Sequence, residues 1–86
     1  MSETKIKINV LLFGACREAA GAEELACEIA APATVARAWA ELQRVYPALG
    51  GFAQSVLFAV NEEHVRAEQS LHGGDTLAIF PPVSGG

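Results

Sequence analysis

The chain has 86 residues, which is enough for one domain with a single modest core. Its formal net charge is -4 and its glutamates are scattered, so a nucleic-acid backbone would be repelled. No apolar run approaches the roughly 18 residues of a membrane span, and Lys5 and Lys7 interrupt the region where a signal peptide has its apolar segment. We therefore expect a soluble cytoplasmic protein that binds neither nucleic acid nor membranes.

The segment from Lys5 to Phe13 alternates with a period of two, which is typical of a β-strand. Four aliphatic side chains share its predicted core face: Ile6, Ile8, Val10 and Leu12. Its other face begins polar and ends apolar, at Leu11 and Phe13. A turn or short helix over residues 16–21 leads to a second predicted strand, residues 23–29, which would pair with the first.

A helix is predicted after Pro32, with Thr34 as its N-cap and Pro47 at its end. Its apolar side chains recur at helical spacing and form one stripe: Val35, Ala38, Trp39, Leu42, Val45 and Tyr46. Such a stripe must be buried against another element, and a sheet is the natural partner.

The remaining segments are predicted to be strands and turns. Residues 56–60 favour a strand, residues 61–63 a turn, and Val65 a further short strand. Residues 73–75 favour a turn into a last strand at 76–80. With one helix and a mixed sheet, this order predicts an α+β protein of the β-grasp (ubiquitin-like) fold, although a split βαβ arrangement has similar elements.

Beyond residue 80 the sequence changes character, so we divide the chain into a domain at 1–80 and a tail at 81–86. The tail reads Pro81, Pro82, Val83, Ser84, Gly85 and Gly86. The prolines cannot extend the sheet as donors, and six residues in a polyproline-like conformation reach about 20 Å. The two glycines have no side chains, so the end of this tail fits a narrow channel. The tail therefore offers a carboxylate on a thin, extended arm.

Only two cysteines are present, Cys16 and Cys27, and neither has a neighbour at metal-ligand or redox-pair spacing. Both lie in or beside apolar segments, so we interpret them as small core residues rather than nucleophiles. No metal site is expected.

The tail and three other stretches resemble the small subunit of molybdopterin synthase, a family of ubiquitin-like sulfur carriers. The ending Phe80–Gly86, preceded by residues 74–77, carries most of the resemblance. The first strand with its following turn, and the pair Val60-Asn61, are similar as well; in that first region the matching residues are Val10, Leu11, Leu12, Phe13, Arg17, Glu18 and Gly21.

The resemblance implies a sulfur-carrying role for Gly86. In this family an ATP-dependent adenylating enzyme activates the terminal glycine, and sulfur then replaces AMP to leave a thiocarboxylate. The large synthase subunit, in a 2:2 heterotetramer, receives the tail and passes the sulfur to cyclic pyranopterin monophosphate. The small subunit has no catalytic activity of its own and binds no cofactor, since ATP is used by its partner.

A docking surface is expected where the first and last strands lie side by side, as they do in a β-grasp. Their outward faces would bring Leu11 and Phe13 next to Phe80, at positions where the family has partner-facing aromatics. Arg17 is a further candidate, either paired with a partner's carboxylate or solvated. The family's contact near His64 is usually apolar, so the sequence departs from the family there.

Three alternatives share some of these features. A sulfur carrier for thiamin or tRNA thiolation has the same fold and ending and differs in its adenylating enzyme and acceptor. A ubiquitin-like modifier forms an isopeptide bond to lysine instead of releasing sulfur. A pure interaction module uses the sheet and does not need the tail.

Overall fold

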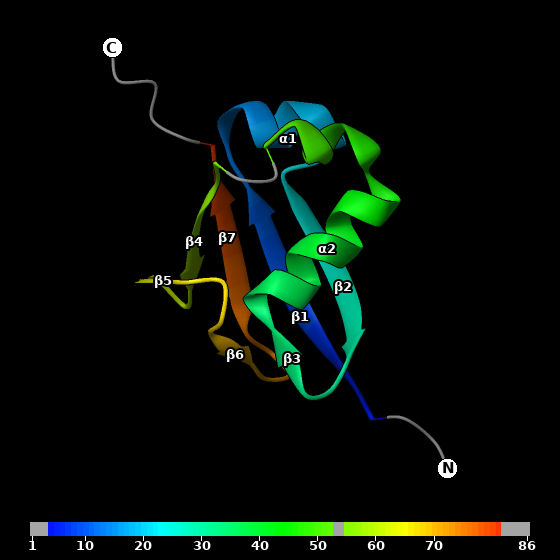
Figure 1. Cartoon of the computed structure of the whole chain (residues 1–86), viewed down its shortest axis with the longest axis vertical. Coiled ribbons are helices and arrows are strands. Elements are labelled where there is room, and N and C mark those ends of the chain that lie inside the picture. Colours follow the sequence, from blue (N-terminus) through cyan, green and yellow to red (C-terminus); the bar gives the residue numbers. More distant parts are fainter. Residues whose placement is uncertain (1–3, 53–54, 82–86) are drawn as a thin grey trace.

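The computed structural model describes residues 4–52 and 55–81 (Figure 1). In chain order the elements are β1 (Lys5–Leu12), α1 (Gly14–Ala20), β2 (Glu24–Ala30), β3 (Ala33–Thr34), α2 (Val35–Val45), the 3₁₀-helix η1 (Pro47–Phe52), β4 (Leu57–Val60), β5 (Glu63–Val65), β6 (Ser70–Leu71) and β7 (Thr76–Phe80). No helix of the described residues is long and apolar enough to cross a membrane.

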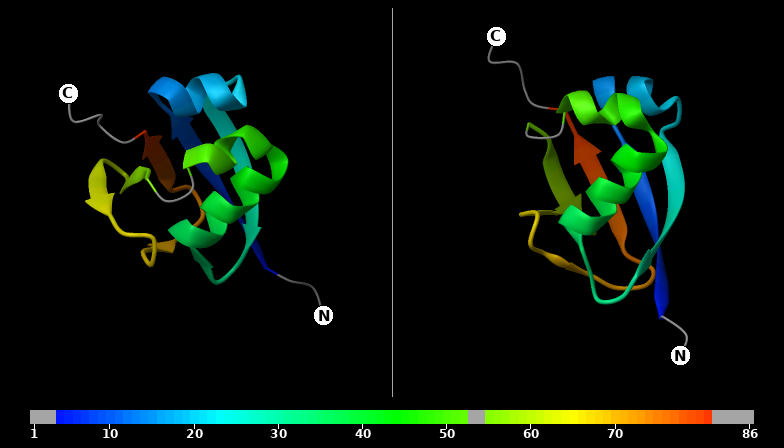
Figure 2. Two further views of the ribbon diagram at one scale, coloured as in Figure 1. Left: turned by 45° about the horizontal axis from the view of Figure 1, so that its top comes forward. Right: turned by 45° about the vertical axis from the view of Figure 1, so that its right-hand side comes forward.

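The main sheet is mixed and has five strands in the order β2-β1-β7-β4-β5. The central pair, β1 and β7, is parallel, whereas the other neighbouring strands are antiparallel. Helix α2 lies across one face of this sheet, and α1 lies at the end where β7 finishes (Figure 2). The described residues place no helix on the opposite face (Figure 2). That face is where a partner can approach the sheet directly.

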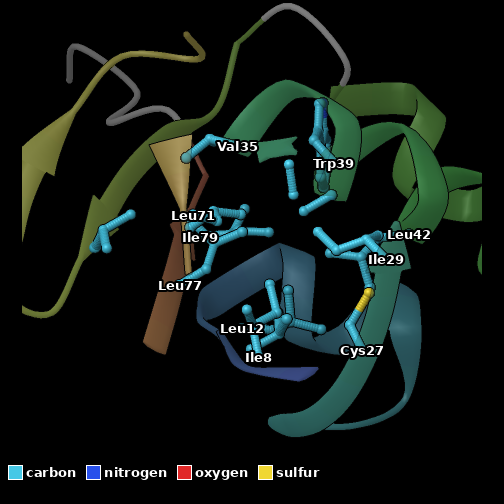
Figure 3. Close-up of a cluster of buried hydrophobic side chains, with 14 of the residues drawn as sticks. Ile8, Leu12, Cys27, Ile29, Val35, Trp39, Leu42, Leu71, Leu77 and Ile79 are labelled. Atoms are coloured by element: carbon cyan, nitrogen blue, oxygen red, sulfur yellow. The ribbon is translucent and has the colours of Figure 1, made fainter. Parts of the chain in front are cut away.

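The core lies between α2 and the sheet, and it contains the side chains that the two periodicities predicted. Trp39 and Leu42 of α2 point toward Ile8, Leu77 and Ile79 of the strands (Figure 3). All the buried side chains among the described residues are apolar. Thr34 caps the helix as expected, since its hydroxyl accepts a hydrogen bond from the Arg37 N–H at 3.3 Å.

The structure differs from the predicted elements in a few places. Val45 was predicted in the buried stripe, but it is 50% exposed, because α2 ends at this residue, beyond the last fully packed turn at Leu42. The two-residue strands β3 and β6 pair with each other and were not predicted. The segment Pro47–Phe52, for which no element was predicted beyond the end of the helix at Pro47, is a 3₁₀-helix. None of these differences affects the open face of the sheet.

Candidate functional site

The open face is apolar where β1 and β7 end. Phe13, directly after β1, stacks on Phe80, the last residue of β7, with ring centroids 4.7 Å apart and ring planes at 10°. The backbone N–H of Phe13 donates to the carbonyl of Ile79 at 3.2 Å, which extends the parallel pairing of the two strands by one bond. Phe13 is nevertheless 41% exposed. The prediction that the two aromatic residues are neighbours is therefore confirmed. The stacked pair forms an apolar surface that is partly exposed to solvent.

Beside this stack lies an open groove of about 450 Å³, called the groove from here on. Its apolar lining consists of Leu11, Phe13, Ala59, Ala78 and Phe80, and its polar lining of Asn61, Glu62, His64 and Thr76. The strand register explains its shape, because Ala78 of β7 lies opposite Leu11 on one side and opposite Ala59 on the other. Two alanines in the centre leave space between bulkier neighbours, so the groove can receive a protruding side chain of a partner.

A hydrogen-bond network fixes the polar end of the groove. The β4–β5 turn consists of Asn61 and Glu62, which have φ angles of 51° and 75°, as a type I′ turn requires. The Asn61 amide accepts from the Thr76 N–H and donates to the Asp75 carboxylate, both at 3.0 Å. The His72 N–H donates to the other oxygen of Asp75 at 2.8 Å. These bonds attach the β4–β5 hairpin to the start of β7.

The same bonds favour the ionised form of Asp75. The His72 backbone N–H, followed by the Asn61 amide, holds the pKa of the Asp75 carboxyl below its usual range. Because the folded-state pKa is lowered, the stabilisation is present above about pH 4 and is lost as the pH falls through the folded-state pKa.

We predict that Asp75→Asn lowers the free energy of unfolding by about 1 kcal/mol at pH 7, since charge-assisted hydrogen bonds are weakened. The difference from wild type should shrink as the pH falls from 4 toward 2. Urea denaturation across this range measures it. Glu68→Gln, at an exposed carboxylate, is the matched control and should change little. A difference for Asp75→Asn that stays constant with pH would contradict this account.

Gly14 leaves space for the start of the tail. It has a φ of +55°, and a Cβ built on it would lie 3.0 Å from Cγ of Pro81. The first tail residue therefore packs closely over Gly14, next to the Phe13–Phe80 stack. A side chain here would be strained by the backbone and would also push against the proline ring. Gly14 was not among the residues predicted from the sequence, where the only signal was a glycine close behind the first predicted strand.

We predict that Gly14→Ala destabilises the fold by about 1–2 kcal/mol and displaces Pro81. Under the sulfur-carrying role that the family resemblance implies, this displacement should slow loading of the tail. Gly21→Ala is the matched control, because Gly21 has a φ of +74° and a Cβ placed on it would have no atom within 4 Å. Both variants carry the backbone strain, but only Gly14→Ala should slow loading when the two are compared under conditions where both are folded. Equal loading rates would show that the contact with Pro81 does not position the tail.

The other predicted site residues, Arg17 and the tail, and one residue that was not predicted to belong to the site, His64, lie in three places. Arg17 lies outside the groove and forms an exposed ion pair with Glu23 at 3.7 Å. The carboxylate that pairs with Arg17 therefore comes from the same chain, and an exposed pair of this kind is weak. His64 lies inside the groove. The tail residues Pro82, Val83, Ser84, Gly85 and Gly86 lie outside the described residues, so their predicted role, and the division between residues 80 and 81, stay predictions.

Both cysteines are buried free thiols, as predicted. Burial raises the pKa of the Cys16 thiol. Burial and then the charge of Glu41 raise the pKa of Cys27. Since the thiolate is the nucleophile, neither side chain is prepared to accept sulfur at neutral pH. Within residues 4–52 and 55–81, no three His, Cys, Asp or Glu side chains are grouped so that they could hold a metal ion.

Comparison with known proteins gives consistent results. The profile of the ThiS family matches residues 10–86. The chain is similar to the molybdopterin synthase sulfur carrier subunit of Chlamydomonas reinhardtii, with 37% identity over 83 residues that cover 94% of this chain and 100% of the relative.

Two solved structures support the fold. Small archaeal modifier protein 1 of Haloferax volcanii has a TM-score of 0.83 at 28% identity, covering 91% of this chain and 99% of that chain. A chain in the complex of subunits 1 and 2 of the molybdopterin-converting factor from Helicobacter pylori has a TM-score of 0.63 at 20% identity, covering 94% and 100%. The predicted β-grasp fold is confirmed.

Proposed function

The chain belongs to the ThiS family, and we propose that it is a sulfur carrier subunit of molybdopterin synthase whose sulfur is carried on Gly86. The observation that supports this most strongly is the family match, which runs through the tail to Gly86. A relative named as this carrier covers nearly the whole chain at 37% identity, which supports the same assignment.

The chemistry follows from the nature of a carboxylate. An ionised carboxylate is a poor electrophile, so an adenylating partner must first transfer AMP to Gly86 from ATP, with release of pyrophosphate. A sulfur donor then displaces AMP and leaves a thiocarboxylate. In the large subunit the thiocarboxylate gives its sulfur to cyclic pyranopterin monophosphate, and water restores the carboxylate. A dithiolene has two sulfurs, so each product consumes two loaded carriers.

In this scheme the chain is a substrate and an arm rather than a catalyst. Its own residues position the tail: Gly14 supports Pro81, and the Phe13–Phe80 stack with the groove docks the partner. The partner would be the large synthase subunit in a 2:2 assembly in the cytoplasm. The solved Helicobacter pylori complex shows a chain of this fold together with a second subunit, which supports docking of this kind.

The test is an intact-mass measurement of the full chain after incubation with ATP, a sulfur donor and the adenylating enzyme. We expect the mass gain of one oxygen replaced by one sulfur, and fragment masses should assign it to Gly86. A chain lacking Gly86 is the control and should gain no mass.

A second candidate function comes from the structural likeness to small archaeal modifier protein 1 at 28% identity. A modifier would join its terminal carboxyl to lysine side chains of other proteins. If Gly86 were found in covalent adducts with other proteins and never as a thiocarboxylate, the modifier function would replace the carrier function. A carrier for another thiolation pathway would load normally and fail with the large synthase subunit.

A further inference from the structure

His64 lies in the groove at a position that the sulfur-carrier role does not explain. It lies in β5 directly opposite Ala59 of β4, and its ring centroid is 6.3 Å from that of Phe80, with the ring planes tilted by 42°. Its side chain therefore extends the apolar surface of Ala59, Ala78 and Phe80 toward the edge of the sheet. Any partner that covers this surface also covers the imidazole.

The groove around His64 is mostly apolar, with two exposed carboxylates nearby. Within the part of the chain that the structure describes, His64 takes part in no hydrogen bond or ion pair. The neighbouring strands contribute Ala59, Ala78 and Phe80 to the groove, and β1 contributes only apolar groups. The nearby carboxylates are Glu62, in the turn that lines the groove, and Glu63, the first residue of β5; both are exposed. In the free chain the His64 side chain is exposed to solvent.

We propose that His64 is a docking residue accepted only in its neutral form, so that acid weakens binding of the large synthase subunit. This inference rests on the proposed function, since it takes that subunit, with an apolar surface facing the groove, as the occupant. Docking removes the imidazole from water, and the loss of hydration penalises the charged ring far more than the neutral one. An imidazole changes charge between about pH 5 and 8, which makes docking sensitive to pH in the physiological range.

The size of the change in affinity follows from the fraction of the chain in which His64 is neutral and able to bind. When only the neutral form binds, the apparent dissociation constant is the intrinsic constant divided by the neutral fraction. An imidazole changes charge within this range, so we expect affinity to fall about tenfold between pH 7.5 and 5.5. A leucine at this position removes the titrating group and keeps an apolar surface.

The experiment measures the dissociation constant for a molybdopterin synthase large subunit and the full-length chain at pH 7.5, 6.5 and 5.5 and constant ionic strength. Wild type should lose about tenfold over this range, while His64→Leu and His64→Gln should each lose about twofold or less. His72→Gln is the matched control, because His72 is 80% exposed and is not part of the groove. This control should keep the pH dependence of wild type.

The outcomes separate the two proposals. An equal loss for wild type and His64→Leu, or tighter binding of wild type in acid, would overturn the inference while leaving the carrier function intact. Tighter binding in acid would show that the partner presents a carboxylate to His64. Failure of wild type to bind the subunit at pH 7.5 would contradict both proposals.

Discussion

Removal of Gly86 is expected to reduce sulfur transfer to background while leaving the fold as stable as wild type. The shortened chain still ends in a carboxylate, at Gly85, but the arm is shorter by about 3 Å. Enzymes that act at the end of a narrow channel lose orders of magnitude in rate when the reacting atom is displaced by such a distance. The measurements are molybdopterin formation with the large subunit and the free energy of unfolding in urea.

The two cysteines provide the control for this experiment, because they are the other candidate sulfur sites. Cys16→Ala and Cys27→Ala each remove a buried thiol, so a stability loss of about 1 kcal/mol is expected from the lost packing. Sulfur transfer should continue in both variants at temperatures where they are folded. Activity in the chain without Gly86, or its loss in a folded cysteine variant, would show that the sulfur is carried elsewhere.

Phe80→Ala is expected to weaken binding to the large subunit by about 30-fold or more, as the loss of a central aromatic residue does in other interfaces. The substitution removes the ring that stacks on Phe13 and forms part of the groove. Affinity can be measured by calorimetry with the purified large subunit.

The matched control for this variant is Val45→Ala. Val45 is also an exposed apolar residue, but it lies at the end of α2, away from the open face. This control should bind as wild type does. If Phe80→Ala and Val45→Ala bound equally well, the partner would have to dock on another surface.

The regular parts of the fold could be predicted from periodicity. Alternation in β1 identified its core face, and the helical spacing from Val35 to Leu42 identified the buried side of α2. Periodicity could not identify β3 and β6, because two residues contain no repeat. It also included Val45 in the stripe, since spacing does not show where a helix extends past the elements that cover it.

Three aromatic and aliphatic residues of the candidate site could be predicted, but its remaining residues and its shape could not. Strand parity placed Leu11, Phe13 and Phe80 on outward faces, and the β-grasp order made β1 and β7 neighbours. The groove depends on register, which brings Ala59 and Ala78 between larger side chains. The contact of Gly14 with Pro81 depends on a positive φ angle and on where β7 ends, and neither can be read from composition or spacing.

The most direct test of the carrier function is to load Gly86 with isotopically labelled sulfur and to mix the chain with the large subunit and cyclic pyranopterin monophosphate. The account predicts that the label leaves the chain and appears in the dithiolene of molybdopterin, with two carriers consumed per product. Label that stays on the chain, or that is released while the chain becomes joined to other proteins, would contradict it.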